Sequence, residues 1–371
     1  MMIYWISFIT SLFFICCAQK TKFKSDLYII LSLIGLLIPC ILAGFRSVTI
    51  GTDVLSYAKP LFDLAMRADN FSEFYLSHWY DSWRSIETNS FEIGYVLFVW
   101  ICAKIFKQFW ILLFLTQVFI ILPIYLAIIK IRNYVSIPIF FVLYYALYFN
   151  TSLNLMRQYI ACSFIFFVIT YYNPENRIIK QIYLILILLL AISFHFSAII
   201  GFILLIVKFY LHNKPFNNTV ILCVLFGFTI FFLPFFLNFL RKIGLSYYVN
   251  SYLGNGVVHI EISQFLIRLP IIACIVYIII KKEFSKFTNF YVCISIFSLL
   301  CSQLISLGAF NSRIGLYFDI ISLILPAFIC NKNKNKIVSY TYSFFILLYC
   351  IIYWYYFYVE LNYSETVPYL F

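Results

Sequence analysis

The chain has 371 residues, of which 64% are hydrophobic and 11% are charged, and its formal net charge is +12. A soluble domain carries roughly a quarter charged residues, so a water-soluble fold of this chain would expose large apolar patches. The positive charge gathers in short lysine runs between apolar segments, which is typical of cytoplasmic loops and disfavours nucleic acid as a partner.

Apolar segments follow one another along the chain, with lengths near the roughly 20 residues that cross a bilayer as an α-helix. The sequence predicts an all-α polytopic integral membrane protein of roughly 11 to 14 transmembrane helices, forming one transmembrane domain over residues 1–371. The candidate spans are approximately residues 2–18, 27–45, 92–107, 109–130, 134–149, 157–172, 178–194, 196–211, 219–240, 264–280, 288–308, 313–330 and 338–358. Most of the eleven cysteines lie inside such runs without a CxxC spacing, so we predict no disulfide framework and no metal site, and nothing implies a cofactor.

Two polar stretches interrupt the apolar pattern, at residues 46–90 and 241–263. In the first, apolar residues recur at near-helical spacing, which predicts short amphipathic helices at the membrane interface, while the second is predicted to be a turn-rich loop. The positive residues place both stretches outside the cytoplasm. That topology requires residues 91–131 to cross the membrane an odd number of times although they hold two apolar segments, so we expect the short segment 92–107 to be re-entrant or interfacial.

Ionisable residues at a membrane boundary are costly and are therefore candidates for function. The first group follows the second span and contains Arg46, Asp53 and Tyr57. Arg46 is suited to hold a phosphate and Asp53 to act as a general base, although a snorkelling arginine and a solvated aspartate are equally compatible with the pattern. Glu92 opens an apolar run, where it is either a charge at a helix N-terminus or a proton-transfer group with a raised pKa.

Asn154, Arg157 and Gln158 lie at the start of a span that otherwise holds no charge. An arginine that faces a helical bundle needs an anionic partner, so Arg157 requires either a carboxylate or a ligand phosphate. His195 lies between two phenylalanines and is either a structural histidine or a neutral base. The remaining candidates are Arg268, Arg313 and Tyr317.

The order of these groups resembles the EpsG-like polymerases, which belong with the Wzy-type O-antigen and exopolysaccharide polymerases. The shared pattern is R-x₄-G-x-D-x₃-Y, F-E-x-G-Y, L-N-x-x-R-Q, F-H-x-S and a late R-x₃-Y, at residues 46–57, 91–95, 153–158, 194–197 and 313–317. The resemblance implies a multi-pass glycosyltransferase of the bacterial cytoplasmic membrane that acts at its periplasmic or outer face. Its substrates would be oligosaccharide repeats linked to undecaprenyl diphosphate, and its partners the lipid bilayer and a chain-length regulator.

In such a reaction, negative charge develops on the leaving diphosphate, and fixed arginines would stabilise it. The arginines proposed for this role are Arg157, Arg268 and Arg313, followed by Arg46. Asp53 ranks ahead of Glu92 and His195 as the base, because a carboxylate on a loop can reach an incoming sugar. The aromatic residues expected to stack on sugar rings are Tyr57, Trp79 and Trp83. Three other functions remain open: an O-antigen ligase, a membrane O-acyltransferase, and a polysaccharide flippase without catalysis.

Overall fold

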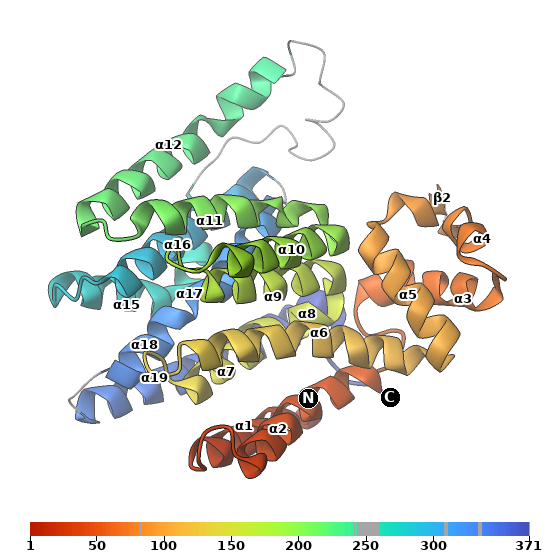
Figure 1. Cartoon of the computed structure of the whole chain (residues 1–371), viewed down its shortest axis with the longest axis horizontal. Helices are drawn as coiled ribbons and strands as arrows, with labels where there is room; N and C mark the ends of the chain where they lie inside the picture. The colour runs from red at the N-terminus through yellow and green to blue at the C-terminus, as the bar shows by residue number, and fades with distance from the viewer. Residues whose placement is uncertain (82–83, 241, 243–259, 308–310, 333–335, 371) are drawn as a thin grey trace. The chain divides into compact units, whose positions relative to one another are not determined.

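The computed structural model describes residues 1–81, 84–240, 242, 260–307, 311–332 and 336–370, which are almost entirely helical (Figure 1). In this part of the chain, seven helices are long and apolar enough to cross a membrane: Met2–Gln19, Asp26–Gly44, Phe109–Lys130, Phe216–Leu233, Lys286–Leu307, Arg313–Asn331 and Ser339–Glu360. Shorter apolar helices cover Ile93–Phe106, Met156–Tyr171, Ile178–Phe194, Phe196–Leu211 and Leu269–Ile280. The predicted all-α polytopic membrane fold is confirmed.

The chain forms two compact units, and each is described by itself. The first unit contains residues 1–172, 176–201 and 341–371, and the second contains residues 173–175 and 202–340. The first unit therefore contains both ends of the chain, and Tyr4 Oη donates to the Thr366 carbonyl at 2.6 Å.

Helix pairs of the first unit approach closely where a glycine replaces a side chain. Helix α1 (Met2–Gln19) packs along α2 (Asp26–Gly44). A Cβ atom on Gly35 of α2 would lie 3.0 Å from the Ser11 carbonyl oxygen, and Ser11 Oγ donates to the Gly35 carbonyl at 2.6 Å. Small residues commonly allow such contacts between membrane helices. Helix α2 also packs on α6 (Phe109–Lys130), which in turn packs on α9 (Met156–Tyr171).

The apolar run predicted at residues 134–149 is not a plain α-helix. Helix α7 (Ile137–Tyr144) continues as a π-helical segment, η3 (Tyr145–Phe149), and then as the single turn α8 (Asn150–Asn154). Two further π-helical segments lie in the first unit, η1 (Val54–Ala58) and η8 (Tyr355–Glu360). The latter extends α19 (Lys336–Trp354) and precedes the short helix η9 (Tyr363–Glu365).

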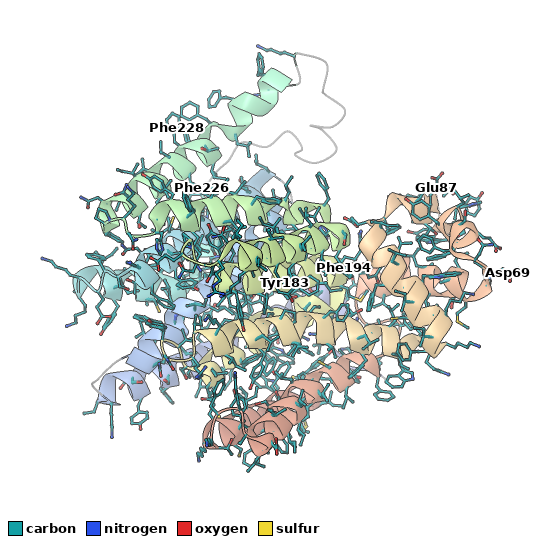
Figure 2. All side chains as sticks on the ribbon, viewed as in Figure 1. Asp69, Glu87, Tyr183, Phe194, Phe226 and Phe228 are labelled. Atoms are coloured by element: carbon teal, nitrogen blue, oxygen red, sulfur yellow. The ribbon has the colours of Figure 1, made fainter. Side chains whose placement is uncertain are left out.

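The polar stretch 46–90 contains the short helices that its sequence predicts. After η1 come α3 (Lys59–Arg67) and α4 (Phe71–Tyr75), followed by a hairpin of β1 (His78–Asp81) and β2 (Arg84–Glu87) that the sequence did not predict. The turn η2 (Thr88–Ser90) leads into α5 (Ile93–Phe106), which packs on α3 and α4 (Figure 1). The exposed acids Asp69 and Glu87 lie on the outer rim of this group (Figure 2). Thus α5 is tied to the polar stretch as well as to α6.

The first unit also contains α10 (Ile178–Phe194), which packs along α9, and the turn η4 (Phe196–Ile199) that follows it. In the second unit, the described residues form α11 (Ile200–Leu211, whose first two residues belong to the first unit), α12 (Phe216–Leu240), α14 (Ile262–Ile267), α15 (Leu269–Ile280), α16 (Lys286–Ser302), η6 (Gln303–Leu307), η7 (Asn311–Gly315), α17 (Leu316–Ser322) and α18 (Ile324–Lys332).

Helix α12 packs along α16, where the Phe226 and Phe297 rings stack with centroids 3.9 Å apart. Phe228, two residues further along α12, is 61% exposed (Figure 2). Of the predicted loop 241–263, residues 241 and 243–259 lie outside the described residues, and α14 begins within its last residues.

Candidate functional site

The site is built on a break between two helices. Helix α8 ends at Asn154 and α9 begins at Met156, because Leu155 between them has φ −82° and ψ 54°. Such a break leaves carbonyl groups without their helical donors. Arg46, just after α2, supplies a donor for one of these carbonyls, because its Nη2 donates to the Leu153 carbonyl at 2.8 Å. Its Nη1 donates to the Ala43 carbonyl of α2 at 3.0 Å. Arg46 therefore ties the end of α2 to the helix break.

The loop after Arg46 lies directly against the break. Gly51 has φ +84°, and a Cβ atom there would lie 3.2 Å from the Leu153 carbonyl oxygen, so both conformation and space favour glycine. Asn154 Oδ1 accepts hydrogen bonds from Thr52 Oγ1 and from the backbone N–H of Asp53, both at 2.9 Å. Tyr57, in η1, donates its hydroxyl to Asp53 Oδ2 at 2.8 Å. Asp53 is thus held at its backbone by Asn154 and at its carboxylate by Tyr57.

Arg157 has the carboxylate partner that its sequence context requires. Its Nη1 forms an ion pair with Glu92 Oε2, and the other oxygen, Glu92 Oε1, accepts from the Phe196 backbone N–H at 3.1 Å. The guanidinium lies 4.8 Å from the ring centroids of both Tyr57 and Phe91. About a fifth of the Arg157 side chain (21%) remains exposed. The guanidinium is therefore oriented, on a side chain that is not fully buried.

Gly94 allows the start of α5, and with it Glu92, to lie close to the turn that contains His195 and Phe196. A Cβ atom on Gly94 would lie 2.3 Å from Ser193 Oγ and 2.6 Å from the Ser193 carbonyl oxygen. The start of α5 therefore lies against the end of α10, just before His195. His195 Nδ1 accepts from the Ser197 backbone N–H at 3.4 Å and lies 2.7 Å from Ser197 Oγ. An accepting Nδ1 places the proton of the neutral ring on Nε2.

Two groups outside the spans have pKa values set by burial. Burial lowers the pKa of Arg46 to about 10, so the side chain is still a cation at neutral pH. Burial, followed by the charge of Asp53, raises the pKa of Tyr57, which therefore remains a hydrogen-bond donor to that carboxylate. Among the described residues, no carboxylate forms an ion pair with Arg46.

Three hydrogen-bond donors of the described site residues are not used in the structure. Within the described part of the chain, Arg46 Nε, Arg157 Nε and Tyr95 Oη are buried without a hydrogen-bond partner. Unpaired buried donors are uncommon in folded proteins, and an acceptor that reaches them is favoured. The chemistry of this set of donors suits an anion.

Arg268, a candidate of the second unit, belongs to a separate polar cluster. Arg268 donates from Nη2 to Asp319 Oδ2 at 2.8 Å and from Nε to Asp319 Oδ1 at 3.3 Å, and its Nη1 donates to Gln264 Oε1 at 3.0 Å. Ser298 also donates to the Asp319 carboxylate. The Arg268 and Asp319 side chains are 9% and 5% exposed, so this is a buried ion pair. All three nitrogens of Arg268 therefore have partners inside the second unit.

Arg313 lies in η7 and the buried Tyr317 in α17, four residues later. In the first unit, Gln158 is buried in α9. Trp79, on β1, stacks on Phe91 with ring centroids 5.7 Å apart, whereas Trp83 lies outside the described residues.

The structure thus brings four of the five sequence groups together in the first unit: residues 46–57, 91–95, 153–158 and 194–197. Sequence reasoning missed Asn150, whose side chain holds α8 through Trp354 and Thr366. It also did not assign roles to Phe91 and Tyr95, although both belong to a recognised motif. A buried asparagine in an apolar run is the signal that could have identified Asn150.

A family model described as the EpsG family matches residues 29–371, which is all of the chain except α1, the turn after it and the first residues of α2. No curated protein and no solved structure matches the chain.

Proposed function

This chain belongs to the EpsG family, and we propose that it polymerises oligosaccharide repeats linked to undecaprenyl diphosphate. The reaction would take place at the outer face of the bacterial cytoplasmic membrane. The donor is the growing glycan on its lipid, and the acceptor is one lipid-linked repeat. Family membership and the multi-pass fold support the reaction class. The observation that carries the site is Arg157, partly exposed and oriented by Glu92 and two aromatic rings.

In the proposed reaction, an acceptor hydroxyl attacks the anomeric carbon of the donor sugar. A new glycosidic C–O bond forms, the bond to the diphosphate oxygen breaks, and undecaprenyl diphosphate leaves. The hydroxyl proton passes to a base. Because charge develops on the leaving diphosphate, a donor already oriented in the site lowers the barrier without reorganisation. Arg157 is the residue of the first unit that we assign to this role.

The contacts divide the other residues by role. Arg46 is 5% exposed and donates to two backbone carbonyls, so we assign it to supporting the helix break and to the positive potential of the site. Both Glu92 oxygens are occupied, by Arg157 and by the Phe196 N–H, so Glu92 orients Arg157. His195 Nδ1 already accepts from the Ser197 backbone N–H, which leaves Nε2–H as a donor. Asp53 remains our candidate base.

Incubating the purified protein in nanodiscs with lipid-linked repeats tests the proposal, and the expected result is a ladder of longer products. An O-antigen ligase would transfer glycan only to an added lipid A–core acceptor. An O-acyltransferase would instead transfer label from an acyl donor. A flippase would move the lipid-linked repeat across vesicles without lengthening it. The absence of a ladder together with any of these three results would overturn the proposal.

A further inference from the structure

The C-terminal segment of the chain lies against the loop that carries Asp53. The Ser47 backbone N–H donates to the Leu370 carbonyl at 2.8 Å, and the Gly51 N–H donates to the Glu365 carbonyl at 3.2 Å. These two bonds bracket the loop between Arg46 and Asp53. Backbone donors removed from water must find partners, and for the N–H groups of Ser47 and the buried Gly51 the C-terminal segment provides the acceptors.

The same segment holds α8, the helical turn that carries Asn154. Asn150 Nδ2 donates to Thr366 Oγ1 at 2.9 Å, and Trp354 Nε1 donates to Asn150 Oδ1 at 2.9 Å. Asn150, Thr366 and Trp354 are all 0% exposed. The asparagine side chain therefore forms a buried link from α8 to the end of α19 and to the segment beyond it.

Further contacts fix the C-terminal segment itself. Tyr4 Oη donates to the Thr366 carbonyl at 2.6 Å, and Tyr369 Oη donates to the Leu42 carbonyl at 2.7 Å, one helical turn before Arg46. The Tyr358 hydroxyl, in η8, donates to the Leu147 carbonyl of η3. Wide π-helical turns often occur at functional sites, and here the Tyr358 hydroxyl joins two of them, η8 and η3.

We propose that residues 362–370 are a positioning element of the candidate site. They hold the 46–53 loop and α8 in the register that places Asp53 against Asn154 and keeps Arg157 at the helix break. The segment touches no substrate in this scheme and acts through the loop and α8. The inference rests on the proposed function only where kcat is measured, because the mobility of the loop can be measured without turnover.

Thr366→Val tests the inference because it keeps the shape of the side chain and removes the acceptor for Asn150 Nδ2. Thr366→Ser retains that acceptor. The matched control is Thr170→Val, since Thr170 is also buried but its hydroxyl donates only to the Phe166 carbonyl of its own helix. Loop order is reported by a spin label on Ser56→Cys, an exposed position of η1 outside the site, in a background without other cysteines.

We expect Thr366→Val to increase the mobility of the Ser56 label and to lower kcat by roughly tenfold to a hundredfold, the scale of a small misplacement of reacting groups. Thr366→Ser and Thr170→Val should match the parent protein in both measurements. An unchanged label and unchanged kcat in folded Thr366→Val would overturn the inference, even if its unfolding temperature falls.

If Thr366→Val does not fold, Tyr369→Phe is tested in its place by label mobility and kcat, because it removes only the hydroxyl that donates to the Leu42 carbonyl. If the parent protein makes no ladder, the proposed function fails. The mobility of the Ser56 spin label then tests the positioning element without a turnover measurement. A looser label in Thr366→Val then supports the positioning element, and an unchanged label overturns it.

Discussion

Arg157 is the residue whose environment most limits what can replace it. Its guanidinium pairs with Glu92 and lies against both the Tyr57 and the Phe91 ring. Arg157→Ala should abolish chain lengthening while leaving protein level and single-repeat lipid unchanged. Arg157→Lys should restore little, because an ammonium group lacks the planar fork of donors. The measurement is ladder formation in nanodiscs.

Arg132→Ala is the matched control for Arg157, because Arg132 also stacks on a ring, at 3.6 Å from the Phe23 centroid, but is exposed and belongs to a predicted cytoplasmic loop. It should retain normal activity. Normal polymer lengths in Arg157→Ala would remove Arg157 from the site.

The Asp53→Asn variant distinguishes between two roles of Asp53, a general base and a residue that only shapes the loop. Asn154 binds the backbone N–H of residue 53, and an amide oxygen can still accept from Tyr57, so the loop should keep its position. If Asp53 is the base, kcat should fall by about 100-fold or more. Asp63→Asn, which removes a half-exposed charge paired with Lys59, should have little effect. Asp53→Asn with near-parental turnover would shift the base to Glu92 or His195.

At the scale of elements, the contact between α5 and α10 depends on one glycine. Gly94→Ala would place a Cβ atom 2.3 Å from Ser193 Oγ, so α5 must shift and carry Glu92 away from Phe196. We expect destabilisation of about 1–3 kcal/mol, the usual cost of overpacking, together with reduced activity. Unfolding in detergent measures the first effect.

Gly227→Ala in α12 is the control for Gly94→Ala, since its Cβ would meet a Leu300 methyl group at an ordinary 3.6 Å. Alanine is also the better helix former, so this variant should be neutral or more stable. Equal stability losses in the two variants would contradict the role of close packing at Gly94.

Most helices could be predicted from sequence because they coincide with long apolar runs that end at charged or turn-forming residues. The predicted spans 134–149 and 157–172 leave a gap around Asn154. The turn α8 and the exact break at Leu155 could not be predicted, because nothing in the run from residue 150 to residue 157 excludes a continuous helix. The site groups were predicted from their ionisable residues. The contacts of Thr366 and Tyr369 were not, because they involve backbone carbonyls or a buried amide that leave no pattern in the sequence.

At the scale of the whole molecule, the path of residues 91–131 decides the topology. Helix α5 has 14 residues, fewer than a span usually needs, and it packs on α3 and α4 of the polar stretch. We therefore expect cysteines at the exposed positions Ser90 and Gln108 to be labelled from the same, outer side by an impermeant reagent in spheroplasts.

Ser72→Cys, exposed on α4, should also be labelled from outside, and Asn173→Cys, beside the basic residues after α9, should be protected. Labelling of Ser90→Cys with protection of Gln108→Cys would make α5 a full crossing. That result would contradict the predicted topology of residues 91–131.

The three π-helical segments of the first unit bear on which insertions and deletions the chain can tolerate. Such a turn contains one residue more than an α-helical turn, so removing one residue from η1 would restore a regular helix without breaking the chain path. Each residue turns an α-helix by about 100°, however, so the deletion would rotate Asp53 and Tyr57 relative to α3. A relative that lacks one residue here would therefore need a compensating insertion before α3 to present the same side chains to a substrate.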